Sequence, residues 1–483
     1  MKMALKFVSK VELRRRLLSV VFFMVALASA VSAAEAAGSL KLPAYKKVKL
    51  KNGMTLLLVE RHTVPLIGLH AIVKAGGVGD PVGKEATAWM TANLLRKATR
   101  NRTADQFSSE LDFVGGQFSA AANADFTTIS AEFVKKDINK GLDLLEDALV
   151  NPTFPQDEFT KLLKQRVDGL KASRDQAQAV AGTYFNAFLF GAHPYGRPVT
   201  GDEKSLAALT RDDVLKFYQS FYTPGNTILA VAGDFSAPEM EALLTRKFES
   251  WPARPSPVIA VPEPVAFSGK KLLLIDKPDS TQTFFRLGNV GIARTNPDRV
   301  YLNVVNTLFG GRFTSMINTE LRIKTGLTYG ANSFFDERKR PGPFVITTYT
   351  KNATTVEAMD KALEVLRLLQ EKGITEEQLK SAKNYIQGQF PPEIETAGQL
   401  AALLADLEFY GLDEHEINDF YAKIDAMTLA DAQRVIRQYY PVDNLVFVVI
   451  GKASEIGPLM KKYASRIEVR SITDPGFGNV TEN

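Results

Sequence analysis

The sequence lacks cysteine altogether, and its 483 residues include only four histidines and two tryptophans. Without cysteine there can be no disulfide framework, no thiol nucleophile and no lipid-modified cysteine. The formal net charge is only +5, and the Lys and Arg residues are interspersed with Asp and Glu rather than gathered in a basic stripe. This pattern argues against nucleic acid as a partner. The composition is that of an ordinary globular chain, long enough to bury at least two sizeable cores.

Long apolar runs are also missing, except near the N-terminus. Lys10 and Arg14 to Arg16 precede an apolar run from Leu17 to about Ala28, and small residues follow at Val31-Ser32-Ala33. This order is typical of a secretory signal peptide, which we predict to span residues 1–33. An uncleaved membrane anchor is the alternative, although the run is short for a membrane-spanning helix. We expect a periplasmic or secreted bacterial protein with no membrane span after signal cleavage.

The remainder of the chain contains one pattern twice. Asn226 recurs as Asn444, and the strand-like run that ends at Gly233 recurs as one that ends at Gly451, both 218 residues later. An array of short repeats would have a period of roughly 20–50 residues. The observed period has the size of a domain, and the sequence therefore predicts two related domains.

The strand-like and helix-like segments are grouped rather than strictly alternating, which predicts an α+β fold. We expect each domain to contain an antiparallel-rich mixed sheet with helices packed on it. Five prolines between 252 and 264 exclude a helix or a central strand there and indicate a linker. The predicted organisation is a flexible segment 34–42, a first domain 43–250, a Pro-rich linker 251–264, a second domain 265–470 and a tail 471–483.

Four short stretches, in this order and spacing, point to a known family. They are His193-Pro194-Tyr195-Gly196-Arg197-Pro198, Thr223-Pro224-Gly225-Asn226 before an apolar strand and Gly233-Asp234, Gly310-Gly311-Arg312-Phe313, and Leu321-Arg322-Ile323-Lys324-Thr325-Gly326-Leu327-Thr328-Tyr329. Together they resemble the pitrilysin/insulinase family of zinc peptidases, in its half-length branch that contains mitochondrial processing peptidase. The resemblance covers nearly everything after about residue 40 and implies a two-domain chain that forms half of a clam-shell chamber.

Active members of that family carry His-x-x-Glu-His on the helix that follows the second strand. Residues four apart share a helix face, so both imidazoles reach one zinc, and the glutamate between them deprotonates the bound water. A further glutamate about 75 residues later completes the ligands. In this sequence the matching positions hold Trp89, Ala92, Asn93 and, for the distant ligand, Gly169. The resemblance therefore implies that this chain has no catalytic residue and no metal site.

No pair among the histidines has the spacing of a helical metal site. The four histidines are His62, His70, His193 and His415. We predict that His62 and His70 are structural, and that His193 is a turn residue packed against Tyr195. The segment Glu414-His415-Glu416 has no second imidazole nearby, and we expect it to lie on the solvated surface.

Arg322 and Tyr329 remain as candidate functional residues. A helix predicted at Thr314–Lys324 ends at Gly326, a residue suited to a helix C-terminus, and a strand is predicted at Thr328–Phe335. The two side chains are then expected at one corner. The resemblance implies that this Arg/Tyr pair binds the substrate and orients the peptide, by holding its carbonyls or a carboxylate. Judged on the residues alone, the structural interpretation is preferred, with Arg322 an arginine favoured at a helix C-terminus and Tyr329 a core tyrosine.

These observations lead to a hypothesis about the partner. We expect the zinc-free subunit of an exported two-subunit zinc metallopeptidase, which binds and orients peptide substrate for a homologous subunit that carries the zinc. The alternative is a non-enzymatic peptide-binding or scaffold protein with the peptidase fold. No residue pattern supports a self-sufficient peptidase with an unrecognised site.

Overall fold

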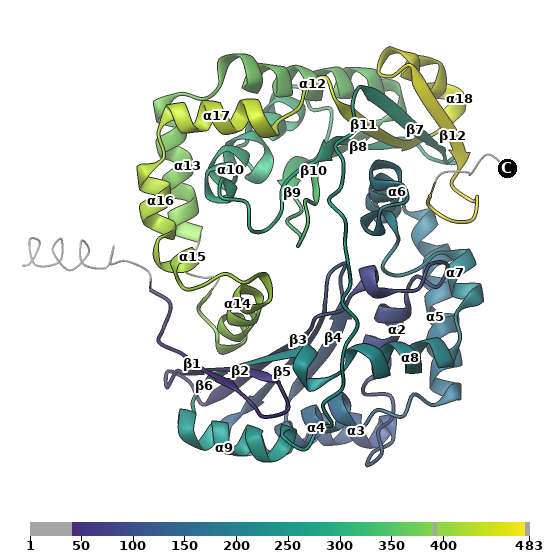
Figure 1. Ribbon diagram of the computed structural model, residues 1–483. Coiled ribbons are helices and arrows are strands. Elements are labelled where there is room, and N and C mark those ends of the chain that lie inside the picture. Colours follow the sequence, from purple (N-terminus) through teal and green to yellow (C-terminus); the bar gives the residue numbers. More distant parts are fainter. Residues whose placement is uncertain (1–40, 390–393, 479–483) are drawn as a thin grey trace, which may run out of the picture.

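The computed structural model describes residues 41–389 and 394–478, and it contains two six-stranded sheets. Helices pack on both sheets, and the two sheets belong to successive halves of the chain (Figure 1). The predicted α+β fold with two related units is confirmed. Within the described residues, the structure has no helix that is both long enough and apolar enough to cross a membrane.

Sheet one is built around a buried central strand, β6, whose seven residues are all buried. Its strands are β1 (Lys46–Lys49), β2 (Thr55–Glu60), β3 (Leu66–Val73), β4 (Gln117–Ala122), β5 (Thr127–Val134) and β6 (Thr227–Gly233). They lie in the order β1-β2-β6-β3-β5-β4, and β2 and β6 are the parallel pair. A strand covered on both faces needs a continuous apolar run, which β6 has.

Sheet two repeats this topology, with one difference at its edge. Its strands are β7 (Lys270–Asp276), β8 (Gln282–Val290), β9 (Ala331–Phe335), β10 (Pro343–Lys351), β11 (Leu445–Gly451) and β12 (Arg466–Ser471). The order is β12-β7-β11-β8-β10-β9, so five strands match sheet one. The edge strand β12 follows the others in sequence and pairs parallel with β7, whereas β1 comes first and pairs antiparallel with β2.

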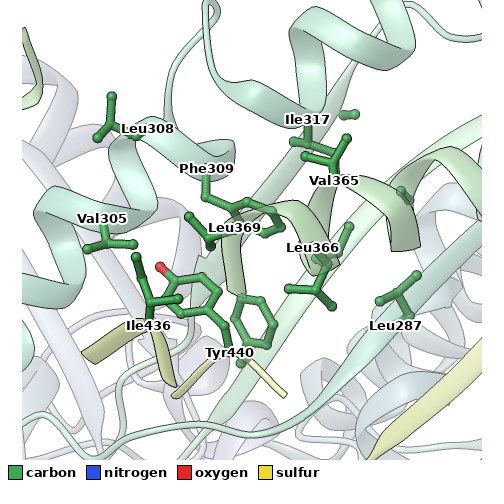
Figure 2. Packing of buried hydrophobic residues seen from close by; sticks show 14 of the residues in the cluster. Leu287, Val305, Leu308, Phe309, Ile317, Val365, Leu366, Leu369, Ile436 and Tyr440 are labelled. Atoms are coloured by element: carbon green, nitrogen blue, oxygen red, sulfur yellow. The ribbon is translucent and has the colours of Figure 1, made fainter. Parts of the chain in front are cut away.

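One face of sheet two is covered by helices of the second half. These are α10 (Arg299–Asn306), α11 (Met316–Asn318), α12 (Thr355–Lys372), α13 (Glu376–Gln389), α16 (Phe420–Ala426), α17 (Leu429–Tyr439) and α18 (Ala453–Ile456), with π-helical turns η5 (Thr307–Gly311) and η6 (Thr319–Lys324). The short helix α15 (His415–Asn418) adjoins α16. Figure 2 shows Tyr440 and Phe309 among the aliphatic side chains of this core. Their rings meet edge to face with centroids 5.4 Å apart, a geometry that aromatic pairs prefer.

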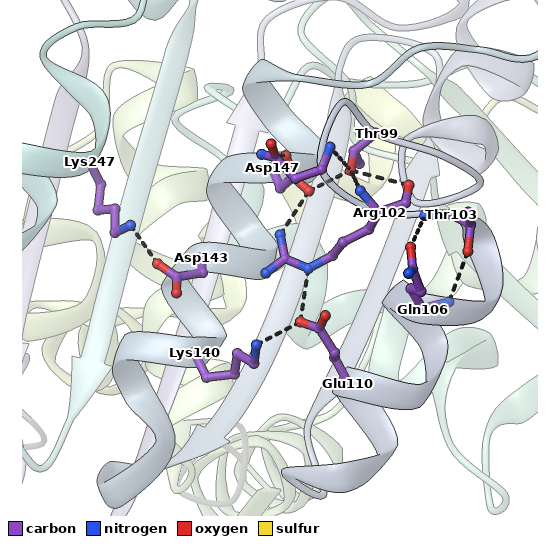
Figure 3. Close-up of polar contacts among 10 residues, drawn as sticks. Thr99, Arg102, Thr103, Gln106, Glu110, Lys140, Asp143, Asp147 and Lys247 are labelled. Carbon is purple, nitrogen blue, oxygen red and sulfur yellow. Dashed lines mark hydrogen bonds and ion pairs between the residues drawn. The ribbon is translucent and has the colours of Figure 1, made fainter.

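One face of sheet one is covered by helices of the first half. These are α2 (Thr87–Leu94), α3 (Ala104–Phe113), α4 (Ile138–Val150), α5 (Gln156–Asp175), α7 (Glu203–Ala208), α8 (Arg211–Phe221) and α9 (Ala237–Phe248). An ionic network joins α3 to α4, because Arg102 contacts Asp147 at 2.8 Å and Glu110 at 2.9 Å (Figure 3). Lys140 pairs with the same glutamate at 2.7 Å. Asp147 is buried, so this pairing satisfies a carboxylate that would otherwise be costly to bury.

The second face of each sheet is covered by a helix from the other half of the chain. Helix α6 (Ala177–Phe190) packs against β8 and β11 of sheet two, and α14 (Ala397–Tyr410) packs against β3 and β6 of sheet one. Both helices lie between the two sheets (Figure 1). They are rich in buried apolar side chains, each of which contributes roughly 1.5–3 kcal/mol on burial. The halves therefore cannot separate without exposing both inner faces.

The crossing of α14 over β3 depends on two glycines. A Cβ atom added to Gly68 of β3 would lie 2.6 Å from the backbone nitrogen of Gly398 in α14. Real Cβ atoms do not approach backbone this closely, so the helix and the strand are in direct backbone contact. A larger residue at Gly68 has to push α14 away from sheet one.

We expect Gly68→Ala to lower the free energy of unfolding by about 1–3 kcal/mol, the usual range for overpacking a tight contact. The matched control is Gly169→Ala in α5, where Gly169 is exposed and a new Cβ has no atom within 4 Å. Alanine there should be neutral or stabilise the protein by up to ~1 kcal/mol, because glycine is a poor helix former. Urea unfolding measures both changes, and equal stability of Gly68→Ala and the parental protein would contradict the glycine contact.

Candidate functional site

Helix α2 occupies the position at which an active family member would hold zinc, and its N-terminus is firmly anchored. The carboxylate of Asp80 accepts the backbone N–H of Ala86 at 3.0 Å and that of Ala88 at 2.7 Å. Arg197 donates to the backbone carbonyl of Asp80 at 2.8 Å. A carboxylate is favoured at a helix N-terminus. Arg197 of the His193–Pro198 motif thus acts on the loop that positions α2.

The residues at the expected metal positions are packed and hydrogen bonded in ways that do not suit zinc. The Arg166 guanidinium of α5 lies 5.8 Å from the centre of the Trp89 ring. Asn93 donates back to the carbonyl of Trp89 at 2.8 Å, and Ala92 is buried. An indole offers only a donor and alanine offers no ligand atom. The nearby guanidinium also repels a divalent cation.

Arg166 is itself held in place by Thr200. Its guanidinium donates to the carbonyl of Thr200 at 2.7 Å and to the Thr200 hydroxyl at 2.8 Å. Burial lowers the pKa of Arg166, yet arginine stays protonated in proteins. Gly169, at the position of the distant ligand, lies three residues further along α5 and carries no side chain. In the part of the chain that the structure describes, no group of three or more His, Asp or Glu residues is arranged to hold a metal ion.

Each of the four histidines lies within hydrogen-bond distance of a polar group. Nδ1 of His193 accepts the backbone N–H of Tyr195 at 3.0 Å, and the two rings lie 5.0 Å apart. The prediction of a turn residue packed against Tyr195 is confirmed. His70 lies 2.8 Å from the Ser130 hydroxyl, and burial lowers its pKa to about 4. His70 is therefore a neutral imidazole at pH 7.

The prediction for the segment Glu414–Glu416 is partly wrong. Glu414 and His415 are exposed, but Glu416 accepts from Arg294 at 2.8 Å and from Nε of Arg299 at 3.1 Å. Its side chain is only 13% exposed. The short helix α15 turns Glu416 toward α10 and the segment before it. Contacts between residues more than 100 positions apart cannot be read from local sequence.

Arg322 and Tyr329 lie on the two sides of a glycine turn. Gly326 has φ +64° and donates to the carbonyl of Arg322 at 3.2 Å, which confirms the expected helix end. The helix differs from the prediction, because Arg322 is in the π-helical turn η6, and β9 begins only at Ala331. Tyr329 is 78% exposed, so the alternative of a core tyrosine is wrong. Neither side chain has a hydrogen-bond partner among the described residues.

Phe313 and Asn318 complete this corner, and the sequence analysis missed the part that they play. The Arg322 guanidinium lies 4.7 Å from the centre of the Phe313 ring. The buried Asn318 amide donates to the carbonyl of Phe313 at 2.6 Å and accepts the N–H of Ala331 at 3.1 Å. Asn318 therefore ties the Gly310–Phe313 loop to the segment that carries Tyr329. The sequence signal for this role was the Gly310-Gly311-Arg312-Phe313 motif, because two glycines indicate a turn that can bring the following phenylalanine to the surface.

A polar cavity of about 360 Å³ lies where the two halves meet. Its lining includes Asp125 and Tyr195 of the first half and Asp336 to Arg338 of the second. The Tyr195 hydroxyl donates to Asp125 at 2.7 Å and accepts the N–H of Arg340 at 2.9 Å, while the other Asp125 oxygen accepts the N–H of Lys339 at 2.8 Å. Burial and the neighbouring Asp125 raise the pKa of Tyr195 well above its usual value. Tyr195 thus docks the β9–β10 loop on the first half.

Comparison with known families agrees with the fold and the motifs. Residues 57–203 match the family described as insulinase, peptidase family M16, and residues 208–386 match a domain described as the peptidase M16 inactive domain. The chain belongs to the insulinase (M16) family of peptidases. On α2 this chain carries Trp89, Ala92 and Asn93 in place of the ligands and the base expected in active members.

Known proteins of several bacteria are similar over most of their length. An uncharacterised zinc protease of Streptomyces coelicolor is 26% identical, over 78% of this chain and 81% of that protein. The zinc protease PqqE of Helicobacter pylori is 25% identical, over 83% and 91%. A solved peptidase M16 inactive domain from Pseudomonas fluorescens superposes with a TM-score of 0.80 at 24% identity, covering 84% of this chain and 98% of that one. The last likeness supports the fold.

The purified chain should bind no stoichiometric zinc and hydrolyse no peptide, because its ligand positions hold Trp89, Asn93 and Gly169 beside a fixed guanidinium. Elemental analysis after exposure to excess zinc measures the first property, and hydrolysis of a peptide pool with and without chelator measures the second. One zinc per chain together with chelator-sensitive cleavage would show that the chain has a metal site elsewhere.

Proposed function

We propose that this chain is the zinc-free subunit of a two-subunit zinc metallopeptidase and that it binds and orients peptide substrate. The observation that carries the proposal is the contrast between the two halves. Helix α2 offers no zinc ligand, whereas Arg322 and the exposed Tyr329 keep their polar groups without an internal partner. An arginine that served only to stabilise its own fold would be expected to find such a partner.

A homologous partner would supply what this chain lacks. Peptide hydrolysis by this family needs a metal-bound water, which requires the His and Glu ligands of another subunit. Orientation of the substrate is separable from that chemistry, because groups across an interface can hold an extended peptide in a reactive position. The zinc protease names of the relatives agree with such a partner, in which we expect the zinc to lie.

Arg322 and Tyr329 are suited to hold a peptide. A guanidinium donates two parallel hydrogen bonds to a carbonyl or carboxylate, and a phenol adds a third donor. Phe313 supports the flat guanidinium by stacking at 4.7 Å, which limits the orientations it can take. The corner therefore presents a partly fixed donor set beside an aromatic surface that is 60% exposed at Phe313.

The second candidate is a non-enzymatic peptide-binding or scaffold protein with this fold. The packed Trp89–Arg166 pair favours it, since it leaves no trace of a metal site. The half-buried Arg322 and the exposed Tyr329, which have no hydrogen-bond partner among the described residues, favour the subunit, because a scaffold does not need free donors for a substrate. Co-purification with a zinc-bearing homologue separates the two functions.

We further propose that the subunit is exported. Arg14 to Arg16 and the apolar run that follows support this, since they have the order of a cleavable signal. The protein recovered from the periplasm should begin near Ala34 by N-terminal sequencing. Cytoplasmic protein that retains Met1 would contradict the export.

In a complex reconstituted with a zinc-bearing homologue, Arg322→Ala should reduce kcat/KM for peptides about ten- to a hundred-fold. The loss corresponds to a charge-assisted hydrogen bond worth roughly 1.5–3 kcal/mol. Tyr329→Phe removes a neutral donor and should cost less. Lys324→Ala is the matched control, because Lys324 lies in the same turn, is exposed and pairs with Glu320.

Zinc content and size-exclusion profiles measured on the same samples separate binding from assembly. Both should stay at parental values in all three variants, because neither Arg322 nor Tyr329 is a metal ligand. Parental turnover in Arg322→Ala and Tyr329→Phe would show that the corner does not bind substrate. Dissociation of the complex would show instead that these residues serve the interface.

A further inference from the structure

Arg286 is a half-buried charged side chain that has no polar partner in the part of the chain that the structure describes. It lies in the middle of β8, and its Nε is buried and makes no hydrogen bond. Arg312 and Arg470 also have an unbonded buried Nε, but their terminal nitrogens bond to Ser381 and to Pro475 respectively. Among the described residues, Arg286 has no hydrogen bond and no ion pair at all. Burial lowers its pKa, and Asp336 is the charge that opposes this shift.

The fold leaves room for this guanidinium. A Cβ atom at Gly182 of α6 would lie 3.1 Å from Nη1 and 3.2 Å from Cζ of Arg286. Glycine in the middle of a helix costs about 1 kcal/mol relative to alanine. At this position it lets the flat face of the guanidinium pack on the helix backbone. Thr183 and Asn186, further along α6, line the polar cavity between the two halves together with Asp336.

Arg286 begins a polar row across sheet two. Thr347 of β10 is the register partner of Arg286 on one side and of Asn332 in β9 on the other. Cross-strand partners point to the same face of a sheet. That face is the inner one, since Val448, the partner of Arg286 in β11, packs against α6. Helix α6 covers β8 and β11, and Asn332 on the far edge is exposed.

The row is flanked by aromatic side chains on the same face. Phe284 and Tyr349 stack with centroids 5.2 Å apart, two positions along from Arg286 and Thr347. Asn332 lies three residues after Tyr329, a separation of roughly 10 Å in extended chain, and Arg286 lies two strands further at about 5 Å per strand. One extended peptide of six or more residues can therefore reach both the Arg322/Tyr329 corner and Arg286.

We propose that Arg286, with Thr347 on the neighbouring strand, binds a carboxylate of the peptide substrate. This inference rests on the proposed substrate-binding function and names the class of peptide that the site takes. The guanidinium supplies parallel donors that match a carboxylate, and the hydroxyl of Thr347 on the neighbouring strand adds a further donor. The carboxylate can be the C-terminus of the peptide or an acidic side chain. Both sources share the chemistry, and peptide design separates them.

The test is calorimetric titration of the full chain, without a partner, using four forms of one ten-residue peptide. One form has a free C-terminus, the second is its C-terminal amide, and the third and fourth are amides with a central Glu or Gln. We expect a carboxylate form to bind about tenfold or more tightly than its neutral counterpart. A difference in the first pair identifies the C-terminus, and a difference in the second pair identifies the side chain.

The variants assign the effect to Arg286. Arg286→Gln should abolish the preference for carboxylate, Arg286→Lys should keep part of it, and Thr347→Val should weaken it a few-fold. Arg322→Ala should weaken the binding of all four peptides alike and keep the preference for carboxylate. The two variants therefore distinguish an Arg322/Tyr329 corner that does not bind peptide from an Arg286 site that does not bind carboxylate. Thermal unfolding of each variant checks the fold, and if Arg286→Gln does not fold, Arg286→Lys and Thr347→Val decide. Equal binding of charged and neutral peptides by the parental chain, an unchanged preference in the Arg286 variants, or no binding up to about 1 mM would overturn the proposal.

Discussion

The backbone contact between Gly68 of β3 and Gly398 of α14 is the constraint on which the arrangement of the two halves depends. It lets a helix from the second half lie directly on sheet one, and α6 covers sheet two in return. Each sheet would expose an apolar face without the helix that the other half supplies, so the two halves stabilise each other. The relative placement of the Arg322/Tyr329 corner and α2 is therefore set by packed helices and does not rely on the extended proline-rich segment between the halves.

Hydrogen bonds around Tyr195 also fix the position of the second half relative to the first. Asp125, Tyr195 and the backbone of Lys339 and Arg340 form a hydrogen-bonded chain between the first half and the β9–β10 loop. The same loop directly follows β9, and the corner with Tyr329 immediately precedes that strand. The histidine–proline–tyrosine motif can thus be understood without a catalytic histidine, because its aromatic and basic side chains position two distant segments. These hydrogen bonds at Tyr195 do not depend on metal ligands on α2.

The sequence predicted a large part of the fold and of the site. The strand-like runs that end at Gly233 and Gly451 are the strands β6 and β11, and they could be predicted because a strand buried on both faces needs a continuous apolar run. Helix α6 escaped prediction, since a helix that is buried on nearly all sides lacks a polar face and its period is weak. Each of α6 and α14 packs on the sheet of the other half, and local sequence patterns do not predict such long-range packing. For the same reason, the partners of Glu416 and the exposure of Tyr329 became visible only in three dimensions.

The lack of an ion-pair partner at Arg286 is evident only when its sequence context and its surroundings in the structure are considered together. In the sequence it is the single charged residue of the segment that forms β8, and an ion-pair partner is the ordinary expectation, since buried charges are usually paired. The structure instead places Gly182 against its guanidinium and leaves its donors free, while the neighbouring Asp336 is occupied by Arg338 at 2.6 Å. An unpaired cation costs stability in the folded protein, and that cost is relieved when an anion binds. Two arginines of the second half, Arg286 and Arg322, thus have no ion pair among the described residues, and it is on these two groups that we base the proposal that this half holds a peptide.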